Sequence, residues 1–368
     1  MREMASIEIS RAVRELHTKV EGSRLRKFYD FGNGSFRIFF YNKAGNLHIY
    51  CSLLSTFNET SLVEEADEAT TFAMSIRKRL ENSLLTSLGQ YGSDRIIVLE
   101  FGNDGFRLLI EMYGKGNVIL INSDGVIEAC YKRIRYKGRS IAIGNHYSLP
   151  EGSPFRFENP TEEAALKAME NVPSGKKLIR FLGDRINIGP LYLEDIILRA
   201  GMDPAKTMAE EADLKAIARE IVAFFMRIEE EKPRVYKENS EIKDYAIAGV
   251  RRYDGLEIEK YESLNLLLDS IYAEGRVIRA DTEKIELVEK TRANIEEQKR
   301  LLVIANTEAE YYSNSGRTVF AHMHEINTVI DYLKRHRNAT LDEVRGIFPG
   351  IVIKELDLKN KVVRIEVE

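Results

Sequence analysis

Cysteines, long apolar runs and recognisable catalytic motifs are scarce in this sequence. Cys51 and Cys130 are too few for a disulfide framework or a zinc knuckle, which fits a reducing compartment. No stretch approaches the roughly 20 apolar residues of a membrane helix. The start, MREMASIEIS, lacks the apolar core of a signal peptide. These absences argue against secretion and against a membrane-spanning protein, and they lead us to expect a cytoplasmic location.

Catalytic and metal-binding patterns are also absent. His322 and His324 lie two residues apart on a predicted helix and face different directions, so they do not form a metal pair. Adjacent carboxylates such as Glu64-Glu65 are typical of solvated helix faces. No Ser-His-Asp spacing, phosphate loop or dinucleotide glycine fingerprint stands out. We therefore predict no catalytic residue, no metal and no cofactor, and the chain is not expected to be an enzyme.

The composition is that of a folded, soluble protein. The chain has 368 residues, of which 30% are charged and 44% hydrophobic, and this length allows two or three domains with a core each. The formal net charge is −4. Overall charge therefore does not predict nucleic-acid binding, and such a prediction has to rest on local clusters of lysine and arginine.

The first 150 residues read as an α+β domain. Apolar residues at helical spacing predict a helix over 6–20, with Ser6 as its cap. A second helix is predicted over 61–88. Short runs of alternating residues, separated by turns, predict antiparallel strands. These predicted strands cover 25–31, 35–42, 46–53, 94–101, 106–113 and 117–134.

The rest of the chain is mainly helical. A long helix from 281 to about 312 carries Val288, Ile295, Leu302 and Ala309 at seven-residue spacing, but the matching positions Arg292, Lys299 and Asn306 are polar. Half a coiled-coil seam of this kind leaves self-association open. Another helix is predicted over 318–337. Thr340 and Glu343 form a capping box, and a hairpin ends the chain.

The predicted domain division has five parts. They are an α+β domain over 1–160, a helical domain over 161–232, a segment packing back on the first domain over 233–278, a coiled-coil helix over 279–317 and a small distal α+β domain over 318–368.

The densest basic run is CYKRIRYKGR, residues 130–139. If it is one strand, Arg133, Arg135, Lys137 and Arg139 share a face at a spacing of about 6.6 Å. Such a row suits a phosphate backbone, which binds through charge neutralisation and counterion release. The alternative is a solvated edge strand that its cations protect from aggregation. Four cations on one face repel each other and exceed what edge protection needs, which favours binding.

Two smaller clusters are more ambiguous. Arg77-Lys78-Arg79 lies on a predicted helix, where it is either a binding surface or an ordinary polar face. Gly114 and Gly116 flank Lys115 and are followed by Asn117. Glycines allow positive φ and close backbone approach, so exposed N–H groups, the lysine and the asparagine could meet an anion. By itself this is a weak signal, and a plain hairpin turn is the favoured explanation of the segment.

The helical region contains a third candidate. Gly189 and Pro190 precede the segment LYLEDIILRAG. Proline in the first turn leaves free N–H groups at a helix N-terminus, where the dipole favours phosphate. The flanking cations are Lys176, Lys177, Arg180 and Arg185. Helix-hairpin-helix modules grip nucleic-acid backbones in this way, and an ordinary αα-hairpin is the alternative.

Asp94 and Arg95 stand at the mouth of the strand IIVLEF. Adjacent strand residues point to opposite faces, so the two side chains cannot form one flat pair. They are either solvated residues at the end of a strand or a polar site that contacts a binding partner.

Together these stretches resemble the NFACT family, which includes the RqcH/fibronectin-binding-protein-A-like proteins and nuclear export mediator factor. The segments that carry the resemblance are residues 72–101, 108–134 and 187–201 and the long helix after 281. The resemblance implies an α+β fold with a glycosylase-like N-terminal domain of antiparallel strands, a helix-hairpin-helix domain and the start of a coiled-coil arm with a small distal domain. It also implies a ribosome quality-control factor. Such a factor binds a large ribosomal subunit carrying peptidyl-tRNA, contacts rRNA, and recruits aminoacyl-tRNA for C-terminal tailing of stalled chains.

The resemblance assigns roles to particular residues. The family's Asp-Arg pair falls on Asp94 and Arg95 and is implicated in engaging tRNA. This favours a site for a binding partner over solvation at the end of a strand. Arginine can contact phosphate or stack on a base, and aspartate can orient arginine or accept from a base edge. The family's Gly-Lys/Arg-x-Asn-like segment falls on Gly114, Lys115 and Asn117, and its helical hairpin on Gly189 and Pro190.

Two alternatives follow from the same resemblance. The first is a DNA-repair glycosylase, because the family's first domains are similar in fold to formamidopyrimidine-DNA glycosylases. Those enzymes need an N-terminal proline amine with an adjacent glutamate, and a four-cysteine zinc finger. The start MREMAS does not supply the first, and two distant cysteines do not supply the second. The second is a fibronectin-binding surface adhesin, which the absent signal peptide disfavours. Family members continue into a further RNA-binding domain, whereas this chain stops at Glu368.

Overall fold

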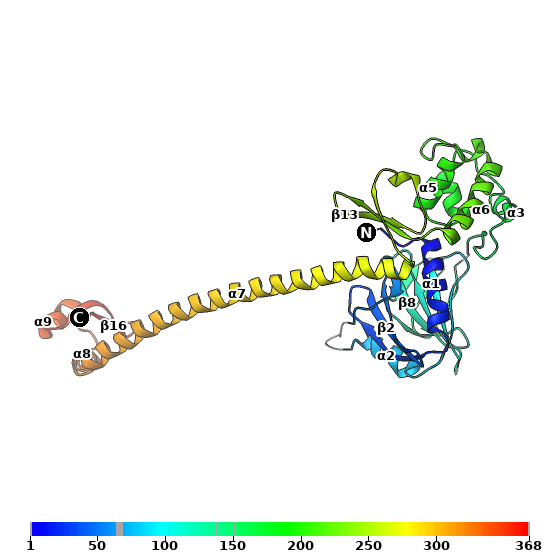
Figure 1. Cartoon of the computed structure of the whole chain (residues 1–368). Coiled ribbons are helices and arrows are strands. Elements are labelled where there is room, and N and C mark those ends of the chain that lie inside the picture. The colour runs from blue at the N-terminus through cyan, green and yellow to red at the C-terminus, as the bar shows by residue number, and fades with distance from the viewer. Residues whose placement is uncertain (1, 64–68, 103, 137–138, 151, 367–368) are drawn as a thin grey trace. The chain divides into compact units, whose positions relative to one another are not determined.

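The computed structural model describes residues 2–63, 69–102, 104–136, 139–150 and 152–366, with the backbone alone for 136 and 273–287 (Figure 1). The chain divides into two compact units, Met1–Val277 and Ile278–Glu368. Within the described residues, no helix is both long enough and apolar enough to cross a membrane.

The first unit begins with a helix and a four-stranded antiparallel sheet. The elements are α1 (Ser6–Val20), β1 (Arg24–Asp30), β2 (Ser35–Asn42), β3 (Gly45–Ser52) and β4 (Thr56–Glu59), with sheet order β1-β2-β3-β4. The predicted antiparallel meander is therefore confirmed, with β4 as an additional strand. The cap prediction is wrong: Ala5 is the N-cap of α1, and the Ser6 hydroxyl instead donates to the Ser93 carbonyl.

A second antiparallel sheet follows helix α2 (Thr71–Leu80). Its strands, in spatial order, are β5 (Leu85–Gln90), β6 (Ile96–Phe101), β7 (Phe106–Glu111), β8 (Asn117–Ile121) and β9 (Ile127–Cys130). The predicted helix over 61–88 is wrong at both ends, because the described residues 61–63 and 69–70 are not helical and β5 occupies part of the end. Thr70 caps α2, the helix ends at Leu80, and Asn82 takes a positive φ of 64° that turns the chain into β5.

The two sheets contribute many side chains to the first unit's core, together with α1 and the later helices. Fully buried side chains such as Phe28, Phe36, Ile97 and Leu108 contribute about 1.5–3 kcal/mol each relative to an exposed position. Strand β8 is buried along its whole length. A smaller cluster around Ile119, together with Leu109, Ile121, Ile127 and Ile141, explains this burial, because it packs separately from the main core.

The middle of the first unit is helical. It comprises α3 (Glu162–Ala168), α4 (Leu178–Arg185), α5 (Pro190–Arg199), η1 (Ala209–Glu211) and α6 (Leu214–Glu230). Helix α6 buries Ile217, Ile221, Phe224 and Ile228, which recur at helical spacing. Figure 1 shows α3, α5 and α6 gathered at one end of this unit, apart from α2 and β2.

A three-stranded sheet follows, and this part of the chain packs against the N-terminal part of the first unit. Its strands are β12 (Arg234–Glu238), β13 (Glu241–Ala246) and β14 (Glu257–Lys260), in the order β13-β12-β14, with η2 (Arg251–Tyr253) before the last strand. Arg2 Nε donates to Asp244 Oδ1 at 3.1 Å, and Glu59 N donates to Asn265 Oδ1 at 2.8 Å. These contacts tie residues beyond 233 to the N-terminal segment and to β4.

Helix α7 (Leu264–Ala321) begins in the first unit and continues into the second. The sequence predicts a helix that begins only at 281, whereas in the structure it already begins at Leu264. In the second unit, Val288, Ile295 and Leu302 of α7 are exposed. The remaining elements are α8 (Met323–Arg335), α9 (Leu341–Ile347), β15 (Val352–Asp357) and β16 (Val362–Glu366). They enclose a small core around Val329, and the predicted capping box of Thr340 and Glu343 is confirmed.

Candidate nucleic-acid interface

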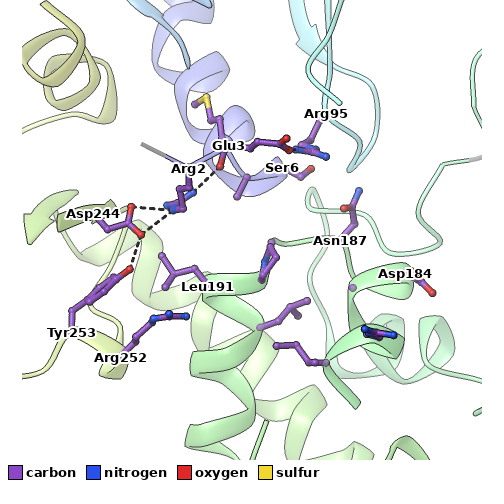
Figure 2. A pocket seen from close by; sticks show the side chains of 18 of the residues that line it. Arg2, Glu3, Ser6, Arg95, Asp184, Asn187, Leu191, Asp244, Arg252 and Tyr253 are labelled. Atoms are coloured by element: carbon purple, nitrogen blue, oxygen red, sulfur yellow. Dashed lines mark hydrogen bonds and ion pairs between the residues drawn. The ribbon is translucent and has the colours of Figure 1, made fainter. Parts of the chain in front are cut away.

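A pocket of about 950 Å³ opens in the first unit, where the N-terminal segment, the turn before β6, the α4–α5 hairpin and the β13–η2 region meet. Figure 2 shows Arg95 and Glu3 on one side of this pocket and Arg2, Asp244 and Tyr253 on another. The apolar part of the lining includes Met4, Ile179, Leu191 and Leu193. The pocket therefore combines charged groups at its edges with apolar surface.

A buried carboxylate, Glu8, organises the N-terminal side of the pocket. It lies in the first turn of α1, where its Oε2 accepts a hydrogen bond from the Ala5 N–H at 2.7 Å. Negative charge is favoured at a helix N-terminus. Glu8 also accepts hydrogen bonds from Arg2 Nη1 at 2.9 Å and from the Tyr192 hydroxyl at 2.5 Å. One side chain thus joins the N-terminal segment to α1 and α5.

Arg2 extends this network to the β13–η2 region. Its Nε donates to both oxygens of Asp244, at 3.1 and 3.2 Å, and the Tyr253 hydroxyl donates to Asp244 Oδ2 at 2.6 Å. Burial alone would lower the pKa of Arg2, but the charge and hydrogen bond of Glu8 outweigh it and raise that pKa above its usual value. Arg2 is therefore held between two carboxylates and has a structural role.

Asp94 and Arg95 lie in the turn before β6, outside the strand, and face different partners. Arg95 lines the pocket, and its Nη1 donates to Glu3 Oε2 at 2.6 Å. Asp94 is half-buried and accepts a hydrogen bond from Asn187 Nδ2 at 3.2 Å. Glu3 therefore orients Arg95 in the structure, a role that the sequence assigned to Asp94.

Burial also perturbs the Asp94 carboxyl. Desolvation raises its pKa above the usual value, while the Ser153 N–H, Arg156 and Asn187 oppose that shift. Its Oδ2 atom is buried. A Cβ added at Gly152 would lie 3.1 Å from this oxygen, so the carboxylate lies against the 152–156 segment.

Gly189 is required where α4 and α5 meet the N-terminal segment. It is the N-cap of α5 with a φ of 119°, and a Cβ there would lie 2.6 Å from Ala5 Cβ. The first helical hydrogen bond of α5 runs from Leu193 N to Gly189 O at 3.0 Å. The N–H groups of Leu191 and Tyr192 precede it, and a helix N-terminus leaves such groups without helical partners.

The hairpin cations differ in their surroundings. Lys176 pairs with Asp184, and Lys177 Nζ donates to the Lys206 carbonyl at 3.3 Å. Arg180 is exposed and Arg185 half-buried, and neither side chain has a partner among the described residues. Arg180 and Arg185 are thus the hairpin cations with side chains left for a phosphate.

The basic run at 130–139 does not form one strand. Strand β9 ends at Cys130, and β10 (Ile134–Tyr136) pairs antiparallel with β11 (Arg139–Ile141). The premise of a single row of four cations is therefore wrong. Arg139 forms an ion pair with buried Glu111 and donates to the Tyr113 hydroxyl at 2.8 Å, so it anchors the hairpin. Lys137 lies outside the described residues.

Two of the three cations on α2 are engaged within the protein. Arg77 Nε donates to the Phe28 carbonyl at 2.8 Å, and Arg79 pairs with Glu128 at 2.8 Å. Lys78 is exposed, and no described residue pairs with it.

Asn117 is buried and its amide is satisfied internally. Its Nδ2 donates to the Lys132 carbonyl at 2.9 Å, and its Oδ1 accepts from the N–H groups of Lys132 and Val118 at 2.9 and 3.0 Å. The RNA contact suggested for Asn117 is therefore not retained, because no polar atom of its amide faces solvent. Lys115, between Gly114 and Gly116 at positive φ, is exposed.

Asn117→Ala is expected to lower the free energy of unfolding by about 2–4 kcal/mol, because it leaves the buried Val118 N–H and the partly buried backbone groups of Lys132 without this partner. Urea unfolding measures this loss, and Lys115→Ala serves as a control that should change stability by less than about 0.5 kcal/mol. Folded Asn117→Ala protein should bind RNA as the parent does. Weaker RNA binding at unchanged stability would return Asn117 to the RNA-binding residues.

We use the name basic face for the remaining cations of α2 and of the chain from β8 to β10, which are Lys78, Lys115, Lys132, Arg133 and Arg135. Lys132 Nζ donates to the Lys115 carbonyl at 2.6 Å, which places these two side by side. The ring of Tyr131 packs 5.7 Å from that of Phe72 on α2, which brings α2 to the same region. The nearby acids Glu111 and Glu128 already pair with arginines.

The sequence matches a family model described as NFACT N-terminal and middle domains over residues 6–350. The chain belongs to the NFACT family. The resemblance of the four quoted segments is thereby confirmed.

Known NFACT relatives carry names from ribosome quality control. The chain is 26% identical over 276 residues to the archaeal Rqc2 homolog aRqcH of Methanocaldococcus jannaschii, covering 72% of this chain and 41% of the relative. It is 25% identical over 238 residues to the human ribosome quality control complex subunit NEMF, covering 60% of this chain and 21% of the relative. The chain thus spans less than half the length of these relatives.

Solved NFACT-like structures share the fold. The fibrinogen binding protein from Staphylococcus aureus superimposes with a TM-score of 0.59 at 20% identity, covering 73% of this chain and 98% of that one. The N-terminal part of the fibronectin/fibrinogen-binding protein from Streptococcus suis gives 0.58 at 18% identity, covering 74% and 99%. These likenesses support the mixed α and β architecture with antiparallel sheets, and at this identity they concern the fold alone.

Sequence reasoning missed several residues of this NFACT pocket. Glu3 and Arg252 carried no recognisable signal, because their partners Arg95 and Glu194 are distant in the chain. Glu8, which supports the pocket without lining it, was also missed. Asn187 carried one: an asparagine just before Ile-Gly-Pro is a candidate for left-handed backbone, and its φ is 54°.

Proposed function

We propose that this chain is part of a cytoplasmic ribosome quality-control factor that binds the large ribosomal subunit and its tRNAs. In this proposal it engages peptidyl-tRNA and rRNA and recruits aminoacyl-tRNA for C-terminal tailing of stalled nascent chains. Family membership and the names of the relatives support the proposal, as do the two places where the first unit presents cations. The proposal includes a helix-hairpin-helix role for α4 and α5.

The observation that carries the proposal is the position of Arg95. Arg95 lies at a pocket edge beside the N-terminus of α5, and its partner Glu3 is exposed on 55% of its side chain. Exposed ion pairs contribute little stability. A phosphate could therefore replace Glu3 at small cost, and charge-assisted hydrogen bonds to arginine are strong. The apolar lining suits an unstacked base of a single-stranded RNA loop.

The proposal assigns binding to the pocket and no chemistry. Its acidic side chains hold arginines and a lysine in ion pairs. Among the described residues, no three histidine, cysteine or acidic side chains gather as a metal site would require. A protein that positions tRNA by charge and shape fits these groups better than a hydrolase does.

Arg95→Ala is expected to weaken tRNA binding by about tenfold, because one charge-assisted contact to phosphate is lost. The slope of log affinity against log salt should fall in magnitude by about 1. Filter binding or fluorescence anisotropy at several salt concentrations measures both quantities. Arg14→Ala is the control, since it removes the same charge from an exposed ion pair with Glu229. Equal affinities and slopes for the two variants would count against the proposed function.

A further inference from the structure

The turn between α4 and α5 is joined directly to the turn that carries Arg95. Asn187 Nδ2 donates to the Ser93 carbonyl at 2.8 Å and to Asp94 Oδ1 at 3.2 Å. Asn187 and Arg95 both line the pocket (Figure 2). The Asn187 amide therefore links the α4–α5 turn to the turn that carries Arg95, although Asn187 lies 93 residues after Asp94 and 94 residues after Ser93. Both turns present side chains to the same pocket.

Other contacts hold the Arg95 turn to its own side of the pocket. Gln90 Nε2 donates to the Asp94 carbonyl at 2.7 Å and to the Ser6 carbonyl at 3.0 Å, and the Ser6 hydroxyl donates to the Ser93 carbonyl. These bonds fix the turn to α1. They leave Asn187 as the side chain that ties the turn to the hairpin within the described residues. An indirect link runs from Ser93 through Phe155 and Ser153 to the Arg185 carbonyl.

The Asp94 side chain takes part in this link between the two turns, which we call the joint, and does not face a ligand in the pocket. Its Oδ1 atom accepts from Asn187, its Oδ2 atom is buried against Gly152, and its side chain does not line the pocket. A carboxylate placed in this way cannot reach a base edge in the pocket. Its contribution to binding has to pass through Asn187.

We propose that Asn187 is a positioning residue that, together with Asp94, fixes the N-terminus of α5 relative to Arg95. The two elements then act as one phosphate-binding surface for RNA. This inference rests on the proposed function, because it concerns how the same pocket presents its groups. It gives Asp94 an indirect role, where the sequence suggested a direct contact with tRNA.

A double-mutant cycle tests the inference. Asn187→Gly removes the amide and keeps the positive φ that this position needs. Asn187→Gly and Arg95→Ala are each expected to weaken tRNA binding by about tenfold, and the double variant by less than about threefold beyond Arg95→Ala alone. Positioning predicts this saturation, because Arg95 contributes only while the joint holds it in place. A loss of folded protein would instead multiply both single effects, so full additivity would overturn the proposal.

Asn171→Gly is the matched control, since Asn171 is also an asparagine at positive φ, 60°, but is exposed in the helical region. It carries the same change in backbone entropy and should leave tRNA affinity unchanged. Asn187→Asp keeps the size and the tolerance of positive φ but places a carboxylate against Asp94 and a carbonyl. It should weaken binding at least as much as Asn187→Gly does, and parent-like binding by Asn187→Asp would contradict the role of the donated hydrogen bonds.

Hydrogen exchange tests the joint without any RNA. In Asn187→Gly, the amides of residues 91–95 and of 186–191 other than Pro190 should exchange at least about tenfold faster, while those of β6 and β7 keep their parent rates. Unchanged exchange in both turns would overturn the inference even if the protein binds tRNA. Conversely, a parent protein without salt-sensitive tRNA binding would refute the proposed function, and faster exchange in both turns would still support the joint.

Discussion

Glu8→Ala is expected to lower the free energy of unfolding by about 3–5 kcal/mol, the largest loss we expect from a single substitution in this chain. The Glu8 side chain is fully buried and accepts hydrogen bonds from the Ala5 N–H, Arg2 and the hydroxyls of Tyr192 and Tyr245. Removing one partner of a buried ion pair is costly because it leaves the other charge without compensation. The buried hydroxyls also lose their acceptor.

The network explains why this loss should affect the pocket as well as stability. Arg2 would keep Asp244 as its partner but lose the carboxylate that holds it from the α1 side. The Tyr192 hydroxyl, which also accepts from the Ile247 N–H at 3.1 Å, would lose its link to α1. The N-terminal segment, α5 and β13 would then no longer share a common anchor.

Chemical denaturation of Glu8→Ala, with circular dichroism as the signal, measures the loss. Glu163→Ala is a suitable control, because Glu163 is also a glutamate in the first turn of a helix but is exposed. Its effect should stay below about 1 kcal/mol, the size of an exposed interaction with the helix dipole. Glu8→Gln should fall between the two, since an amide keeps an acceptor but loses the charge that pairs with Arg2. A loss in Glu8→Ala no larger than that in Glu163→Ala would refute the anchoring role.

Local patterns in the sequence predicted much of the fold. The helix predicted over 6–20 coincides with α1, because its apolar residues recur at a spacing that no neighbouring element disturbs. Strand β5 was missed for a physical reason: Leu84, Leu85 and Leu88 continue the spacing of α2, so they read as helix. Pairing with β6 places Leu85 opposite Phe101, and this tertiary pairing overrides the local pattern.

The candidate interface was harder to predict, because charge pairing depends on contacts between distant residues. Arg139 lies in a basic run, but its partner Glu111 comes 28 residues earlier. Arg79 pairs with Glu128, 49 residues later. Sequence alone cannot separate these structural arginines from Arg133 and Arg135, which remain exposed. Asn117 is the opposite case, since it follows two glycines and a lysine in the sequence but is buried.

The surviving cations of the basic face lead to the second large prediction. Replacing Lys115, Arg133 and Arg135 together with glutamate is expected to weaken RNA binding by at least about 100-fold at moderate salt. The three side chains are exposed and have no partner among the described residues, so their charge is available to a phosphate backbone. The slope of log affinity against log salt should fall in magnitude by about 2–3, since about 0.7–0.9 counterions are released per phosphate contact.

A matched triple variant separates the basic face from net charge. Arg24, Lys27 and Lys43 are exposed cations of the first sheet and the turn after β2, and their replacement by glutamate changes the net charge by the same amount. Such a control should weaken binding by less than about fivefold, because diffuse charge acts over a Debye length of only about 10 Å at 0.1 M salt. Equal losses in the two triple variants would mean that overall charge, and not the basic face, attracts RNA. A larger loss in the first variant, with Arg95 and Asn187 intact, would mean that the pocket and the basic face contact RNA at separate places.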